Sequence, residues 1–226
     1  MRFQNSSAFA PVTARDLVQD RPLVVLAPHP DDETLGCGDL LAVTAAAGTL
    51  CHVVCVTDGA ASHPRSRRWA APHLADLRRA ELIAALKVLG PIDLHMMGHP
   101  DCGAPSGGAA VGALSALVPK GALLLSTWAG DPHVDHQSCA ALAAAVAAAR
   151  PDIAHLAYPV WGRLRPDLPF PRSGWRLTDR APAKAAALAC HASQMTGLID
   201  DDPEGFVMDP ALQALFLSEE EVFLAP

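Results

Sequence analysis

The sequence predicts an α/β fold, a single Rossmann-like domain in which a mostly parallel sheet carries helices on both faces. From residue 23 onward, short β-branched runs alternate with Ala-rich helical stretches, which is typical of parallel strands joined by crossover helices. Half of the 226 residues are apolar and 18% are charged, so the chain can bury a sizeable core. No shift in composition marks a linker. We therefore expect one domain over residues 1–226, with the motifs in about 22–195.

Five short apolar runs predict the strands, in the order LVVLA at 23–27, HVVCVT at 52–57, IDLHMM at 92–97, ALLLST at 122–127 and IAHLAYP at 153–159. The stretches between them predict helices near 35–47, 73–89, 108–118 and 137–149, and a last helix is expected near 181–195. The Pro-rich residues 159–171 predict a loop or a small hairpin. The uncharged stretch 40–57 is split by Gly48 and Thr49, so it predicts a helix followed by a strand rather than a membrane span.

The charge balance excludes two classes of partner. With 17 Lys and Arg against 24 Asp and Glu, the net charge of -7 has the wrong sign for binding nucleic acid or inserting at an anionic membrane.

The six cysteines form no C-x-x-C pair, which predicts free thiols. The first 20 residues hold no apolar run long enough for a signal peptide, so we expect a cytoplasmic protein. The acidic runs at 200–204 and 219–221 are expected to be solvated surface.

The first chemical motif directly follows the first predicted strand and reads Pro28-His29-Pro30-Asp31-Asp32-Glu33. Open parallel sheets bind ligands at the carboxyl ends of their strands. Because clustered carboxylates repel one another, a bound cation is the simplest way to stabilise them. The alternative is an acidic start to the next helix, which accounts for the carboxylates but not for His29.

The second motif follows the fourth predicted strand and reads Asp131-Pro132-His133-Val134-Asp135-His136. Two imidazoles three residues apart can approach a common point, and the carboxylate between them can orient one of the rings. Because both motifs lie at the same edge of the predicted sheet, a shared metal site is favoured over structural histidines and helix caps.

Further motifs occur in the same order as in a known family. They are T-L-G-C-G at 34–38, V-T-D-G at 56–59, R-x-x-E with A-L-x-x-L-G within 78–90, and K-x-x-A-L-x-x-H-x-S-Q at 184–194. With the two motifs above, the chain resembles the PIG-L/LmbE-like zinc-dependent N-deacetylases. This resemblance implies a hydrolase that removes an N-acyl group, most simply acetyl, from a small-molecule amino sugar or a conjugate of one.

The resemblance also implies the roles of individual residues. One divalent ion, zinc or a neighbouring metal, would be held by His29, Asp32 and His136, which leaves an open coordination position of the kind found in catalytic sites. Asp31 would be the general base. His133, oriented by Asp135, would stabilise the oxyanion or protonate the leaving amine.

The chain departs from the family at Asp131, where some members have a tyrosine. The resulting D-x-H-x-D-H is one residue short of the H-x-H-x-D-H pattern of metallo-β-lactamase-like hydrolases. That assignment is set aside because the predicted sheet is parallel and H-P-D-D-E has no counterpart there. Two other functions stay open, a metallohydrolase of an ester or phosphoester and a non-catalytic ligand-binding domain.

Substrate-binding residues are suggested by weaker signals. Arg67 and Arg68, in an arginine-rich stretch after the second strand, are expected to bind an anionic substituent, and the alternative is a solvated basic loop. Asp101, in His-Pro-Asp after the third strand, resembles a family position that contacts substrate hydroxyls. Three tryptophans beyond strand ends would suit sugar rings or core packing, namely Trp69, Trp128 and Trp161. Gly36 and Gly38 are expected to allow close helix–sheet packing.

Overall fold

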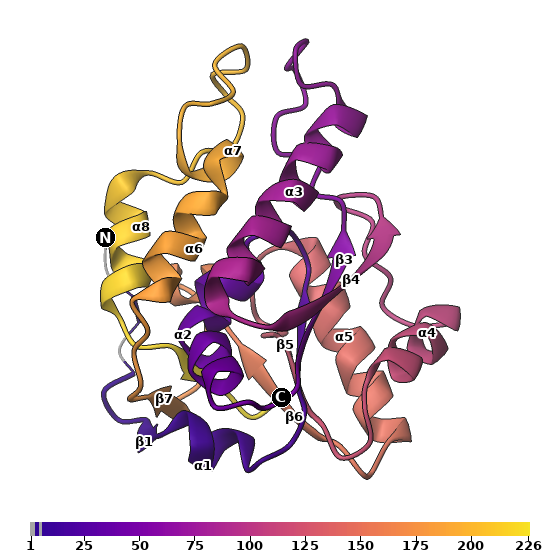
Figure 1. Ribbon diagram of the computed structural model, residues 1–226, viewed down its shortest axis with the longest axis vertical. Coiled ribbons are helices and arrows are strands. Elements are labelled where there is room, and N and C mark those ends of the chain that lie inside the picture. Colours follow the sequence, from indigo (N-terminus) through magenta and orange to yellow (C-terminus); the bar gives the residue numbers. More distant parts are fainter. Residues whose placement is uncertain (1–2, 5) are drawn as a thin grey trace.

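The computed structural model describes residues 3–4 and 6–226, and its centre is an all-parallel sheet of five strands (Figure 1). The strands are β2 (Leu23–Ala27), β3 (Cys51–Thr57), β4 (Ile92–His99), β5 (Leu123–Thr127) and β6 (Ala154–Tyr158). Their order in the sheet is β4-β3-β2-β5-β6. This confirms the predicted α/β fold and all five predicted strands.

The central position of β2 and β5 follows from their composition. Every residue of both strands is buried, because helices cover both faces of the sheet and no position faces water. β4 lies at the edge, and its residues alternate between half-buried and exposed over the first half of the strand. The strand order also brings the ends of β2 and β5, which carry the two chemical motifs, side by side.

The helices divide into two layers, as predicted. One face of the sheet is covered by α2 (Asp32–Ala46), α3 (Ala71–Leu89) and α6 (Ala183–Cys190), and the other by α4 (Ala109–Leu117) and α5 (Val134–Ala149) (Figure 1). A separate apolar core lies on each side of the sheet. Gly36 of α2 faces the ring of Tyr158, and a Cβ atom there would lie 2.3 Å from that ring. Close helix–sheet packing therefore explains this glycine.

Several short elements were not predicted. A second sheet contains β1 (Ala10–Val12), β7 (Trp175–Leu177) and β8 (Val222–Phe223), and the additional helices are α1 (Ala14–Val18), η1 (Trp161–Leu164) and α8 (Pro210–Ser218). The predicted helix 181–195 is divided into α6 and α7 (Ala192–Met195). Strands of two or three residues are too short to show alternation. The Pro-rich segment holds the single turn η1 rather than a hairpin. The expected helix 181–195 is broken at His191, whose buried side chain contacts Glu33 at 3.4 Å.

The expectation that the acidic runs are solvated was wrong for one residue in each run, whereas Asp200, Glu204 and Glu219 are exposed. Glu221 is buried, and its carboxylate accepts hydrogen bonds from Lys184 Nζ at 2.8 Å and from the backbone N–H of Asp39 at 2.7 Å. Asp202 is buried beside Arg65, with 3.2 Å between Oδ1 and Nη2. A charged side chain can be buried in this way because a partner of opposite charge compensates for lost hydration.

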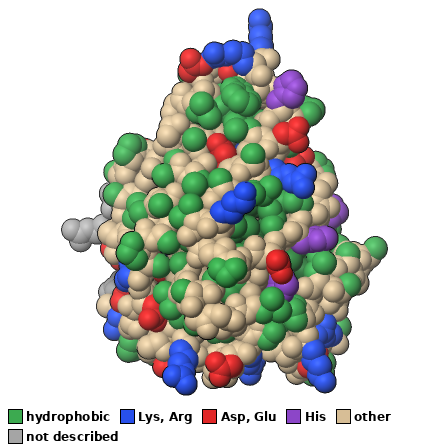
Figure 2. All heavy atoms as spheres, in the orientation of Figure 1, with side chains coloured by type: hydrophobic (Ala, Val, Ile, Leu, Met, Phe, Trp, Pro, Cys, Tyr) green, Lys and Arg blue, Asp and Glu red, His purple; other side chains and the backbone are tan. Residues whose placement is uncertain are grey.

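Two long loops project at one end of the molecule. They follow β3 and α7, and Figure 2 shows basic and acidic side chains close together at this tip, where Arg68 pairs with Asp200. Within the described part of the chain, every helix is too short or too polar to cross a membrane.

Candidate active site

A pocket of about 770 Å³ lies at the carboxyl ends of the central strands. The segments after β2, β4 and β5 supply much of its polar lining, which includes His29, Asp31, Asp32, Asp101 and His133. The two motifs separated by about a hundred residues therefore meet in one place. A volume of this size suits a small-molecule ligand.

Three side chains converge at the base of this pocket. Asp32 Oδ2 lies 3.1 Å from His29 Nδ1 and 3.2 Å from His136 Nε2. Asp32 begins α2, and His136 lies in the first turn of α5. Both helices start directly after a central strand, so their first turns face each other across the edge of the sheet. These are the three residues for which the resemblance implies a metal.

His136 provides the test of whether the group fits a cation. Its side chain is fully buried, and neither ring nitrogen makes a well-oriented hydrogen bond with another described residue. Burial raises the pKa of Asp32, but the charges and hydrogen bonds of His136 and His29 together outweigh this effect and hold that pKa well below its usual range. A buried imidazole nitrogen without a hydrogen bond, facing an ionised carboxylate, suits a divalent ion that would contact both.

The nitrogen of each ring that points away from this cluster lies close to a second carboxylate. His29 Nε2 is 2.9 Å from Asp135 Oδ2, and His136 Nδ1 is 3.4 Å from Asp131 Oδ2. Carboxylates in this position fix the tautomer and orientation of histidines that bind metals. Sequence reasoning identified Asp135 but missed this role for Asp131, which it noted only as the replacement of a tyrosine.

Backbone donors hold both carboxylates in place. Asp135 accepts hydrogen bonds from the N–H groups of Cys102 at 2.8 Å and Ala104 at 2.9 Å. Asp131 accepts three, from the N–H groups of residues 160, 161 and 162, where η1 begins. Each histidine is thus connected through a carboxylate to a neighbouring loop.

Asp31 immediately precedes Asp32, but its side chain has different contacts. It occupies the N-cap position of α2 without making a capping hydrogen bond, and its φ of 144° lies in a region that side chains rarely adopt. Its Oδ2 lies 3.2 Å from Arg78 Nη2. Burial raises the pKa of Asp31 to about 6, although the charge of Arg78 acts in the opposite direction. Helix capping, the alternative considered above, therefore does not account for this carboxylate.

Arg78 was missed as a site residue because it lies on a helix far from either motif. It lines the pocket and is almost fully buried. Its guanidinium donates to the carbonyl of Gly59 at 2.7 Å and to the carbonyl of Pro30 at 2.9 Å. Gly59 has a φ of 64°, and a Cβ atom there would lie 2.4 Å from Nη1, so glycine is favoured at this position. The R-x-x-E motif was the sequence signal that contained this residue.

His133 is held by a backbone contact. Its Nδ1 accepts a hydrogen bond from the N–H of Asp135 at 3.2 Å, so in the neutral ring the proton resides on Nε2. Burial lowers the pKa of His133, and the charges of His29 and His136 lower it further. The ring is therefore a neutral N–H donor. The resemblance implied that Asp135 orients His133, and it is the backbone of Asp135 that does so, while its carboxylate contacts His29.

The expected substrate-binding residues are divided between two locations. Asp101 lines the pocket, where its Oδ2 accepts a hydrogen bond from the N–H of Ala61 at 3.0 Å. Arg67 and Arg68 are not part of the lining. Their backbone N–H groups donate to Asp201, at 2.9 Å and 3.1 Å, and the Arg68 side chain pairs with Asp200. Contact between these two arginines and a substrate stays a prediction.

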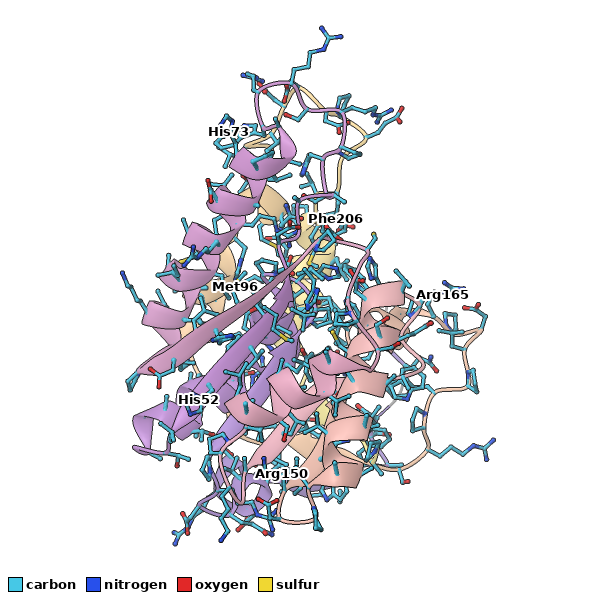
Figure 3. All side chains as sticks on the ribbon, turned by 90° about the vertical axis from the view of Figure 1, so that its right-hand side faces the viewer. His52, His73, Met96, Arg150, Arg165 and Phe206 are labelled. Carbon is cyan, nitrogen blue, oxygen red and sulfur yellow. The ribbon has the colours of Figure 1, made fainter. Side chains whose placement is uncertain are left out.

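An aromatic wall, defined as Trp161 and Phe206, completes the pocket. The two rings lie 5.6 Å apart at 83°. Figure 3 shows Phe206 near the end of the central sheet, beside the long loops, and its N–H donates to the carbonyl of Ser62 at 2.8 Å. Trp161 was one of the three tryptophans noted from the sequence. Phe206 had no local signal, because it follows an acidic run far from either motif.

The chain was compared with known proteins. The PIG-L family model, described as GlcNAc-PI de-N-acetylase, matches residues 24–147. Comparison with curated proteins gave no match. Among solved structures, N,N'-diacetylchitobiose deacetylase from Pyrococcus horikoshii is similar, with a TM-score of 0.64 and 20% identity, covering 90% of this chain and 82% of that chain.

Two further solved structures show the same fold. The zinc-inhibited form of teicoplanin deacetylase Orf2 has a TM-score of 0.65 and 19% identity, covering 89% of this chain and 96% of that chain. GalB, the 4-carboxy-2-hydroxymuconate hydratase of Pseudomonas putida KT2440, has a TM-score of 0.64 and 20% identity, covering 87% and 82%. Because the family model matches more than half of its residues, the chain belongs to the PIG-L family.

Proposed function

We propose that this protein is a metal-dependent N-deacetylase that removes the acetyl group from an N-acetylated amino sugar or a conjugate of one. Zinc would be held by His29, Asp32 and His136. The convergence of these three side chains supports the metal site, and the match to the PIG-L family supports the reaction. Two deacetylases among the similar structures agree with this reaction class.

The observation that carries the proposal is the position of Asp31. Its carboxylate is buried in the pocket next to a proposed metal ligand, caps no helix, and has a pKa raised to about 6. A base with a pKa near the working pH is well suited to accept a proton. At neutral pH the group is mostly ionised, and Asp31 would remove the proton from the attacking water.

Two other groups would stabilise the reacting amide. A divalent ion in this position supplies the Lewis acidity that makes an amide carbonyl reactive toward water. His133, held as a neutral Nε2–H donor, would donate a hydrogen bond to the carbonyl oxygen as negative charge develops there. Arg78 would keep Asp31 in position, because Nη2 contacts that carboxylate while Nη1 and Nη2 donate to the backbone carbonyls of Gly59 and Pro30.

The pocket lining supports an uncharged sugar rather than an anion. Carboxylates at Asp31, Asp32, Asp101 and Glu204 outnumber the one arginine among the described lining residues, Arg78, whose two terminal nitrogens already contact Asp31 and backbone carbonyls. Such a lining disfavours phosphoesters, and also a polyanion such as the GalB substrate named above. The aromatic wall offers flat apolar faces that suit the rings of a sugar. Two of the similar structures, a diacetylchitobiose deacetylase and a teicoplanin deacetylase, agree with this substrate class.

Purified, zinc-loaded protein tests the proposal directly. Release of primary amine would be measured with N-acetylated amino sugars, both free and conjugated, alongside nitrophenyl esters and phosphoesters. We expect amine release from at least one N-acetyl sugar, and a loss of that release in Asp31→Asn. Turnover of the esters or phosphoesters alone would assign the protein to a different hydrolase class.

A further inference from the structure

A second group of metal-binding side chains lies beside the proposed zinc site. Asp101 and Cys102 follow β4, and His133 precedes α5. Each offers a ligand atom, and the three atoms lie within 4.8 Å of one another. All three residues line the same pocket. This group contains none of the three residues proposed to hold the catalytic ion.

The spacing of these atoms is close to that around a tetrahedral ion. With metal–ligand distances of about 2.0–2.3 Å, ligand atoms around one zinc ion lie roughly 3.3–3.8 Å apart. Asp101 Oδ1 and Cys102 Sγ are already 3.6 Å apart. The ligand atom of His133 lies within 4.8 Å of the other two, so tetrahedral spacing requires it to approach by about 1 Å at most. A carboxylate, a thiolate and an imidazole together suit zinc or a softer ion such as cadmium.

The surrounding contacts leave the ligand atoms accessible. His133 uses Nδ1 to accept from the backbone of Asp135, so Nε2 remains for an ion. The backbone N–H of Cys102 is anchored to Asp135, and its thiol lies at the exposed rim of the pocket. Asp101 Oδ1 also lies 3.3 Å from His29 Nε2, so an ion here would compete with that contact.

We propose that Asp101, Cys102 and His133 form a second cation site at the mouth of the pocket, and that a soft divalent ion bound there inhibits the enzyme. The inhibition rests on the proposed function, because it follows from occupation of the nitrogen with which His133 would donate to the substrate. The Cys102 thiol must release its proton to bind the ion, so binding weakens as the pH falls. The site itself requires only the three side chains.

Cadmium added to the zinc-loaded protein tests this site by two measurements. The first is the ultraviolet charge-transfer band of a cadmium–thiolate bond, measured together with the number of bound ions per chain. The second is amine release from an N-acetyl sugar. In the wild type we expect the band, one additional ion, and loss of activity at the same cadmium concentration.

The decisive variant is Cys102→Ser, with Cys190→Ser as its matched control. Cys190, at the end of α6, is the other cysteine that is not buried. Its thiol donates a hydrogen bond to the carbonyl of Ala186. Cys102→Ser should lose the band, bind the additional ion at least ~10-fold more weakly, and retain activity without cadmium. Cys190→Ser should behave as the wild type.

The two measurements separate the site from the proposed function. If Cys102→Ser retains the band or the tight additional ion, the site is wrong. If the band depends on Cys102 but activity does not change, the ion site stands and its inhibitory role is overturned. If no N-acetyl substrate is turned over, the band and ion count still decide the site, and the proposed deacetylase function alone has failed.

Discussion

The carboxylate of Asp135 lies 2.9 Å from Nε2 of His29 while the opposite nitrogen of the same ring, Nδ1, lies 3.1 Å from Asp32. The imidazole thus lies between the carboxylates of Asp32 and Asp135, which follow the adjacent strands β2 and β5, and Asp101 Oδ1 also lies 3.3 Å from Nε2. Asp135 is in turn fixed by two backbone N–H groups. The loop after β4 therefore helps to fix the orientation of His29 through Asp135.

Replacing Asp135 with Asn should weaken zinc binding without unfolding the protein. The amide keeps the size of the side chain but cannot supply the negative charge that orients His29, and losses of this kind typically reduce metal affinity about 10–100-fold. Competition with a chelator measures the affinity. Asp152→Asn, at a surface carboxylate far from the site, is the control. Equal affinity in Asp135→Asn and the wild type would contradict the assigned role.

Replacing Asp31 with Asn should abolish most of the activity but leave the zinc content unchanged. Loss of a general base typically lowers the rate about 10²–10⁴-fold. The turnover number and the bound metal are measured on the same preparation. Loss of zinc together with activity would show that the roles of Asp31 and Asp32 are exchanged, whereas normal activity would place the base elsewhere, with His133 as the next candidate.

The metal-free protein should become less stable as the pH rises toward about 9. Burial lowers the pKa of His136, but the charge of Asp32 and the nearness of Asp131 raise it from 6.5 to about 9. Because the folded-state pKa is the higher one, protonated His136 stabilises the fold below pH 6.5, and this contribution is lost as the pH rises through about 9. Zinc affinity should increase over the same range, since the ion displaces this proton.

Urea midpoints of the metal-free wild type and of His136→Gln, measured from pH 6.5 to pH 9, check this prediction. The wild type should lose stability relative to the variant across that range. Parallel pH profiles for the two proteins would mean that His136 does not titrate in the folded state as its surroundings indicate.

Variants in the loops at the pocket mouth test which side chains bind the substrate. Replacing Phe206 with Ala should raise KM for the N-acetyl sugar several-fold, because it removes half of the aromatic wall.

The double variant Arg67→Glu, Arg68→Glu tests the predicted contact between these arginines and an anionic substituent of the substrate. A solvated basic loop, the alternative, should change KM equally for neutral and anionic substrates, because neither arginine lines the pocket. A selective rise for an anionic substrate would restore the arginines as binding residues.

The sequence allowed the central sheet and the metal-binding group to be predicted for a common reason. Buried parallel strands read as apolar runs, and the ends of such strands lie at one edge of the sheet, so the two motifs were expected to meet there. The choice of His29, Asp32 and His136 as the metal ligands came from the family resemblance. The structure places all three together.

Local sequence patterns did not predict the contacts between segments that are distant in the chain. Arg78 reaches Asp31 from the middle of a helix, and Phe206 reaches the pocket from a loop near the end of the chain. Glu221 lies in an acidic run that predicts an exposed side chain, and its burial depends on the tertiary contact with Lys184. Asp131 illustrates the same difficulty within a motif, because its interaction with His136 depends on how α5 begins. Tertiary packing determines each of these, and no local periodicity encodes it.

The central claim is that His29, Asp32 and His136 hold the catalytic ion, and the zinc content of matched variants tests it most directly. After zinc loading and removal of loosely bound metal, the account predicts about one ion per chain for the wild type and for Asp31→Asn. It predicts almost none for Asp32→Asn or His136→Gln, with folding of each variant checked by circular dichroism. Full zinc content in folded Asp32→Asn and His136→Gln, or none in the wild type, would contradict the account.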